Sequence, residues 1–193
     1  MAGEFAALRD KPFALLCAMD ARLRAAQPGL AQGGEAVWTG LALQIRQHWF
    51  VVPQADVREI VPRPPLARIP GAKAFLCGMA NLRGSLLPVT DLGLLAQQPA
   101  QSESRQQRVV VLNSRHIPAG FLVDAVAGYR SFSPADQRHA LADDSGFPRA
   151  WMLGAFLRDA ETWPVLSLQR VARSEAFVAT GANAGATFAG EAG

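Results

Sequence analysis

The side chains able to do metal, acid–base or thiol chemistry are few and widely spaced in this sequence. The histidines and cysteines are His48, His116, His139, Cys17 and Cys77. A zinc site would have to combine two cysteines 60 residues apart with a loop histidine, so a metal centre is only weakly indicated. The simpler interpretation is that the histidines are solvated in turns and that the cysteines pack as small apolar side chains.

Motifs of the common catalytic and nucleotide-binding sites are also absent from the sequence. There is no phosphate-binding loop, no Gly-x-Gly-x-x-Gly, no Gly-x-Ser-x-Gly and no His-Glu-x-x-His. The adjacent acids Asp143 and Asp144 lie in a predicted loop, where a solvated turn is expected. With no base, nucleophile and anion hole in view, we expect neither an enzyme nor a bound metal or cofactor.

Composition limits the class of protein further. The chain has 193 residues, half of them hydrophobic, which suffices for one ordinary core or two small ones. A net charge of +3 and a pI near 9.4 at first favour a nucleic-acid-binding β-barrel. However, the arginines never form a run of three, aromatic residues are not interleaved with them, and Lys11 and Lys73 are the two lysines. We therefore expect no nucleic-acid partner and keep this module as the alternative.

The sequence also bears on the compartment. No apolar run reaches the roughly 18 residues of a membrane-spanning helix. The N-terminus lacks the basic-then-apolar layout of a signal peptide, and two cysteines give no disulfide framework. We expect a cytoplasmic protein without direct membrane insertion.

The two ends of the chain differ from its middle. Residues 10–26 have the pattern of an amphipathic helix, with Asp10 as a candidate N-cap. A glycine-rich stretch over 27–35 follows, so residues 1–35 are predicted to be a helical extension and linker. Residues 180–193 contain few large apolar side chains, and we expect a disordered tail there.

Between residues 36 and 179, short strands alternate with turns. Strands are predicted over 41–45, 49–52, 57–61, 78–83, 86–90, 108–112, 117–123, 126–132, 151–157 and 162–166. Asp91 is expected to cap a short helix over 92–97, and a second helix is predicted over 168–177. The pattern predicts a mainly β fold.

A weak repeat runs through this region. The first copy contains Leu41, Leu43, His48 and Asp56, and the counterparts 68 residues later are Val109, Val111, His116 and Asp124. In both copies a strand, a polar turn and a second strand lead to Asp-x-Val. Chance similarity and two related β-subdomains are both compatible with so few matches.

The most informative segment runs from residue 57 to residue 92. Arg83 stands between a predicted strand and a glycine turn, and Glu59 is the nearest plausible acid. An arginine fork donates up to five hydrogen bonds and needs fixed acceptors. Two interpretations stay open: Arg83 pins loops together through Glu59 and carbonyl groups, or the pair shapes a docking surface.

Motifs across residues 38–173 resemble the CheW-like coupling domain of bacterial chemosensory arrays. The most specific is Gly-x-x-Asn-Leu-Arg-Gly, present as Gly78 to Gly84, followed at the family's spacing by Pro-Val-x-Asp-Leu, present as Pro88 to Leu92. Supporting segments, in the same order as in the family, are 50–53, 57–60, 108–111 and 120–126.

This resemblance implies two five-stranded SH3-like β-barrels, one after the other, with a hydrophobic groove between them, an N-terminal helix and a short C-terminal helix. The CheW-like domain would span residues 36–179. The implied role is a non-catalytic adaptor that bridges the cytoplasmic tip of a chemoreceptor to the regulatory domain of a histidine kinase, recruited to membrane-bound, polar arrays. The family pattern suggests an ion pair of Glu59 with Arg83. The implied protein-binding residues are Val57, Glu59, Asn81, Leu82, Arg83, Gly84 and Val126.

The N-terminal extension, with its segment 12–16, is most similar to PilI-type members of twitching-motility systems, which serve type IV pili. A flagellar-type chemotaxis adaptor is the alternative. Cys77 and Met79 depart from the family, which often has β-branched residues at these positions. The acid usually found near the kinase-facing turns has no counterpart that we can identify, so the kinase-facing residues are left unassigned.

Overall fold

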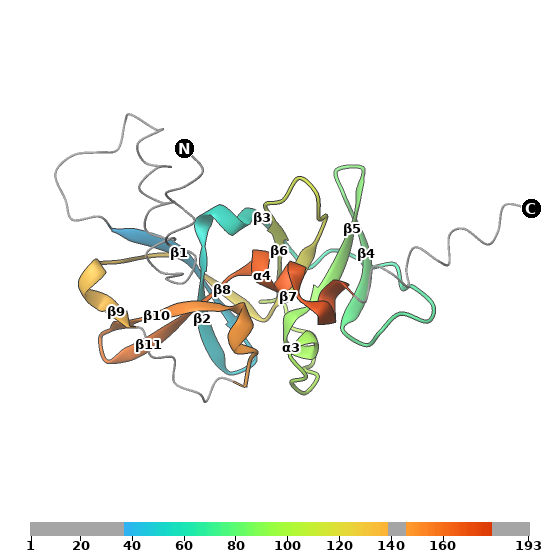
Figure 1. Cartoon of the computed structure of the whole chain (residues 1–193). Helices are drawn as coiled ribbons and strands as arrows, with labels where there is room; N and C mark the ends of the chain where they lie inside the picture. The colour runs from blue at the N-terminus through green and yellow to red at the C-terminus, as the bar shows by residue number, and fades with distance from the viewer. Residues whose placement is uncertain (1–36, 139–145, 179–193) are drawn as a thin grey trace, which may run out of the picture.

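A computed structural model describes residues 37–138 and 146–178 (Figure 1). The predicted N-terminal helix over 10–26, the pair Asp143 and Asp144, and the predicted tail over 180–193 lie outside the described residues. Within them the chain is mainly β, which confirms the predicted fold class. The strands are β1 Trp38–Ile45, β2 His48–Pro53, β3 Val57–Pro62, β4 Leu76–Leu82, β5 Ser85–Asp91, β6 Arg108–Leu112, β7 Gly120–Val123, β8 Ala125–Phe132, β9 Gln137–Arg138, β10 Met152–Arg158 and β11 Glu161–Leu166.

Short α-helices follow two of the strands, β5 and β11. Helix α3 spans Leu92–Leu95, and Asp91 accepts a hydrogen bond from the backbone N–H of Leu94 as the predicted cap. Helix α4 spans Leu168–Arg173 and is capped by Ser167, whose side chain accepts from the N–H of Arg170. The predicted helix over 168–177 is thus interrupted at Ser174, after which residues 175–178 are again helical.

The strands form two sheets, which we call the first and second units. The first unit has the strand order β8-β1-β2-β11-β10-β9, and the second has the order β3-β6-β7-β5-β4. Two details of the expected fold differ. The first unit has six strands because the two-residue β9 is added at its edge. The units also do not follow one another along the chain, which crosses between them after β2 and again after β7.

The repeat in the sequence corresponds to a repeat of structure. In each unit an antiparallel hairpin, β1–β2 or β6–β7, is joined by an antiparallel strand on one side, β8 or β3. On the other side of the hairpin a parallel strand is added, β11 in the first unit and β5 in the second. This strand pairs in turn with an antiparallel strand, β10 in the first unit and β4 in the second. Residues 38–95 and 108–173 therefore run through the same series of five strands and a helix, except that β9 is added to the second series. Each unit takes its hairpin from one series and three strands from the other, and the first unit takes β9 in addition.

The turns of the two outer hairpins also match. Arg83 and Gly84 join β4 to β5 with φ angles of 52° and 84°, and Asp159 and Ala160 join β10 to β11 with φ angles of 53° and 62°. Positive φ at both central residues is the geometry that fits a two-residue hairpin to twisted strands. The turn near Gly84 that the sequence predicted is therefore confirmed, one residue earlier than expected.

Separate clusters of apolar side chains hold the architecture together. Inside the first unit Phe132 of β8 stacks on Phe156 of β10 with ring centroids 4.5 Å apart, although these strands are not neighbours in the sheet. The sheet therefore curls around its own core. The second unit encloses a smaller cluster that includes Ala80 and Val109.

The largest cluster lies between the units. It joins the inner faces of both hairpins to α3 and α4, and it includes Leu43, Phe50, Leu112 and Phe121, each with an exposed fraction of 1% or less. The junction that the resemblance gives as a hydrophobic groove is thus largely filled by side chains of the chain itself. Burial of this apolar surface is the main favourable term for association of the two units.

Candidate docking site

An ion pair marks one corner of the second unit. Glu59 comes from the edge strand β3, and Arg83 comes from the β4–β5 turn at the opposite edge of the same sheet. The Arg83 Nη2 atom lies 3.1 Å from Glu59 Oε2, which confirms the pair that the family pattern suggested. The Arg83 side chain is 86% exposed, whereas that of Glu59 is 23% exposed. Such exposure argues against Arg83 as a pin between loops and leaves its guanidinium available to a partner.

The turn that carries Arg83 is held by its neighbours. The Asn81 side-chain oxygen accepts a hydrogen bond of 2.9 Å from the N–H of Gly84. Leu82 is half-buried and packs against the second unit's core. Asn81 and Leu82 therefore fix the turn from below, so that Arg83 is presented by a rigid hairpin.

Leu86 belongs to the same corner but was missed in the sequence. It pairs across the hairpin with Asn81 and is 67% exposed, which is unusual for a leucine on a strand. Leu86 is followed directly by a second leucine, Leu87, which is buried. The alternation of a strand predicts that one of the two faces outward, but not which one, until the register of the turn is known.

The other two predicted residues lie away from this corner. Val57 opens β3 opposite Leu112 and packs against the core between the units. Val126 lies on β8 of the first unit, opposite Leu43. The structure therefore brings Glu59 together with the turn 81–84, and it places Val57 and Val126 where the two units meet.

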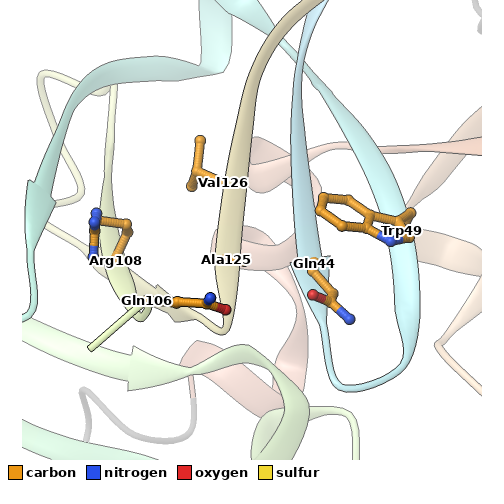
Figure 2. A pocket seen from close by; sticks show the side chains of 6 residues that line it. All are labelled: Gln44, Trp49, Gln106, Arg108, Ala125 and Val126. Carbon is orange, nitrogen blue, oxygen red and sulfur yellow. The ribbon is translucent and has the colours of Figure 1, made fainter. Parts of the chain in front are cut away.

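Val126 lines a hollow of about 330 Å³ to which both units contribute. Figure 2 shows Gln106 and Arg108 on one side of β8, and Gln44 and Trp49 on the other. The indole of Trp49 is 38% exposed, and the Arg108 guanidinium is held by the carbonyl oxygens of residues 105 and 107. The hollow is mixed in polarity, and Trp49 is a second exposed apolar side chain that the sequence did not single out.

Cys77 is the cysteine within the described residues, and it behaves as a packing residue. It is half-buried against the second unit's core. Burial raises the pKa of its thiol, and the nearby Asp91 carboxylate raises it further. The thiol therefore stays protonated at neutral pH, which does not suit a nucleophile. Across residues 37–138 and 146–178, no three His, Cys, Asp or Glu side chains gather in a way that could hold a metal ion.

Comparison with known proteins decides the family. Residues 39–176 match the model of the CheW-like domain, which is well over half of the chain. The chain belongs to the CheW-like domain family. The matched range lies inside the predicted range of 36–179.

Relatives of this CheW-like chain come from several bacteria. It is 32% identical to Protein PilI of Pseudomonas aeruginosa, over 86% of this chain and 94% of that protein. It is 27% identical to Chemotaxis protein CheW of Rhizobium meliloti, over 76% of this chain and 92% of that protein. Among solved structures, the scaffolding protein TtCheW from Thermoanaerobacter tengcongensis superposes with a TM-score of 0.64, covering 72% of this chain and 94% of that one. At 20% identity this last likeness supports the fold.

The CheW-like domain has no described helix suited to crossing a bilayer. In the part of the chain that the structure describes, α3 and α4 have four and six residues, well short of a membrane span.

Proposed function

We propose that this CheW-like protein is a non-catalytic adaptor that couples a chemoreceptor to a histidine kinase in a chemosensory array. The observation that carries the proposal is the match to the CheW-like domain over residues 39–176. The exposed corner at Glu59 and Arg83 supports it, because it offers a rigid, charged surface for another protein. In this role the chain works in the cytoplasm, at membrane-bound receptors, and performs no chemistry of its own.

The array that we propose controls type IV pili and twitching motility. The alignment with Protein PilI covers 170 residues, more than the range 39–176 of the domain, so it extends beyond the CheW-like domain. This extended match favours a pilus system over the alternative, a flagellar-type chemotaxis adaptor. The alternative is supported by the match to Chemotaxis protein CheW of Rhizobium meliloti, at lower identity and coverage.

The docking surface that we propose comprises Val57, Glu59, Asn81, Leu82, Arg83, Gly84 and Val126. The cytoplasmic tip of a chemoreceptor presents amphipathic helices, and an amphipathic helix is recognised through apolar anchors flanked by charges. Arg83 can bind a carboxylate with its two-pronged guanidinium, while the exposed Leu86 beside it offers an apolar contact. Each such contact is weak, but an array presents many of them at once, and avidity raises the effective affinity.

The proposal is tested with two purified partners. Immobilised chain is incubated with a receptor-tip fragment and, separately, with the regulatory domain of the cognate histidine kinase. We expect both to bind, and we expect no salt-dependent mobility shift of labelled single-stranded DNA. The proposal would be overturned if the chain failed to bind one or both of these protein partners. A mobility shift of the DNA at moderate salt would revive the nucleic-acid alternative.

The choice between pilus and flagellum is tested in the cell that encodes the chain. Deletion of the gene is expected to abolish twitching and to leave swimming unchanged. Loss of swimming with twitching intact would favour the flagellar alternative.

A further inference from the structure

The chain crosses between its two units at two points, and an aspartate stands at each. Asp56 immediately precedes β3, and Asp124 immediately precedes β8. These residues are 68 apart and occupy matching places in the two repeats. Asp56 accepts a hydrogen bond at the start of α4, and Asp124 is linked through Arg46 to Asp91, the cap of α3. Each crossover is thus tied to a helix of the other repeat.

The first tie uses neutral partners. The Asp56 Oδ2 atom accepts hydrogen bonds from the hydroxyl of Ser167, at 3.0 Å, and from the N–H of Gln169, at 3.3 Å. The Asp56 backbone carbonyl accepts from the N–H of Asn113, at 2.8 Å. Asp56 is 8% exposed. This cluster joins the β2–β3 crossover, the β6–β7 turn and α4, and we call it the Asp56 latch.

The second tie uses charge. The Arg46 backbone N–H and its guanidinium Nη1 both donate to Asp124 Oδ2, at 2.5 and 3.4 Å. The Nη2 atom of the same guanidinium donates to Asp91 Oδ1, at 2.8 Å. The three side chains are 10–11% exposed. This cluster joins the β7–β8 crossover, the β1–β2 turn and α3, and we call it the Arg46 latch.

Residue types at matching positions explain why the two latches differ. Where the Asp56 latch has the cap Ser167, the Arg46 latch has the cap Asp91, which brings a second carboxylate close to Asp124. Arg46 lies between the two acids and neutralises one of them. Gly93 makes room for it, because a Cβ atom there would lie 2.3 Å from the Arg46 guanidinium carbon. Gln169, the second residue of α4, occupies in the Asp56 latch the place that Gly93 occupies in α3.

We infer that Arg46 is a positioning residue of the adaptor, which fixes β8 of the first unit against α3 of the second and thereby sets the two parts of the docking surface relative to each other. The inference rests on the proposed function for its last step. Val126 lies two residues beyond Asp124, and Val57 directly follows Asp56, so each latch immediately precedes a strand of the docking surface. An adaptor that bridges two partners needs these strands at a fixed relative orientation.

The physical reason is the burial of like charges. Without Arg46, two nearly buried carboxylates would share one site with no cation between them, and removing one partner of a buried ionic group is strongly destabilising. Removing the second acid as well returns the site to one carboxylate with a hydroxyl neighbour, which is the arrangement that the Asp56 latch already uses. The defect of an Arg46 variant should therefore be repaired by changing Asp91.

The test compares Arg46→Ser, Asp91→Ser and the double variant by hydrogen exchange of the full chain. We expect Arg46→Ser to speed exchange of the Leu94 and Asp124 amides by about tenfold or more, while the interior strands β2 and β6 stay protected. The double variant should recover most of this protection. Arg158→Ser is the matched control, because it removes an arginine whose described contacts lie within the first unit.

Binding to the receptor-tip fragment provides the functional readout. We expect Arg46→Ser to bind at least about tenfold more weakly than the wild type, and the double variant to return to within about threefold. Unchanged exchange and binding in a folded Arg46→Ser protein would overturn the inference, as would a double variant worse than either single one. If the wild type binds no partner, the proposed function fails, whereas the exchange measurements still decide whether Arg46 holds the crossover.

Discussion

Reversing the charge of Arg83 separates docking from folding. The Arg83→Glu variant replaces one non-glycine residue by another at a φ of 52°, so the backbone strain of the turn is unchanged. The lost pair joins atoms 3.1 Å apart, but Arg83 is 86% exposed, and ion pairs in such surroundings contribute less than about 1 kcal/mol. Repulsion between the new carboxylate and Glu59 adds a similar amount. We therefore expect a loss of about 1 kcal/mol in unfolding free energy and a folded protein.

Binding should suffer much more. We expect Arg83 to be a hot spot of this interface, and a hot spot costs at least about 2 kcal/mol when it is removed, so the dissociation constant for the receptor-tip fragment should rise about thirtyfold. Isothermal titration calorimetry measures this, and urea unfolding of the same sample measures the stability. The double variant Glu59→Arg with Arg83→Glu should regain the stability but not the binding.

A matched control comes from the other repeat. Asp159 occupies the place of Arg83 in the β10–β11 turn and is 91% exposed. Asp159→Lys also reverses a side-chain charge, in the opposite direction to Arg83→Glu, and we expect this variant to bind the receptor-tip fragment normally. Unchanged binding by a folded Arg83→Glu protein would refute the reasoning, and so would an equal loss in Asp159→Lys.

Two further predictions concern the fold. Burial raises the pKa of Asp56 above its usual 3.8, so the folded state favours the protonated carboxyl group. The contribution of this residue to the unfolding free energy is therefore fully present below pH 3.8, and it is lost as pH rises through the raised pKa. The unfolding free energy of the wild type minus that of Asp56→Asn should therefore fall as pH rises above 3.8, which urea titrations measure, and a difference that grows with pH contradicts this. Gly78→Ala should destabilise by about 3 kcal/mol or more, because its φ is 142° and a Cβ there would lie 2.4 Å from the Ala67 carbonyl oxygen. Gly84→Ala, with a φ of 84° and open space, should cost only about 1 kcal/mol in thermal unfolding, and equal losses would contradict the steric argument.

Local patterns were sufficient to predict most strands. The alternation of Leu41, Leu43 and Ile45 gives β1, since all three are buried on one face of the strand. The Asp91 cap was likewise visible in the sequence. Strand β7 begins later than predicted, at Gly120 instead of residue 117, because Pro118 has no N–H to donate to a neighbouring strand.

The exchange of strands between the units was not predictable in this way. Local spacing shows that Asp56 and Asp124 match, but it does not show which sheet receives the strand that follows each of them. That choice depends on burial between segments far apart in the chain, including the cluster around Phe50 and Phe121. The Arg46 latch was missed for the same reason, since its three residues are 33 to 78 positions apart and share no motif.

The site was predicted in part. The Glu59–Arg83 pair followed from the family pattern, and the structure contains it. Leu86 and Trp49 were missed because an exposed apolar residue has no signature in a single sequence; only the register and the curl of the sheets show that they face outward.

Reconstitution of the ternary complex tests the central claim most directly. Membranes that carry the cognate chemoreceptor are sedimented with the regulatory domain of the histidine kinase, with and without this chain. An adaptor predicts that the kinase domain sediments with the membranes only when the chain is present, and that Arg83→Glu strongly reduces the amount that sediments. Sedimentation of the kinase domain that does not depend on the chain would contradict the adaptor role, as would a chain that stays in the supernatant.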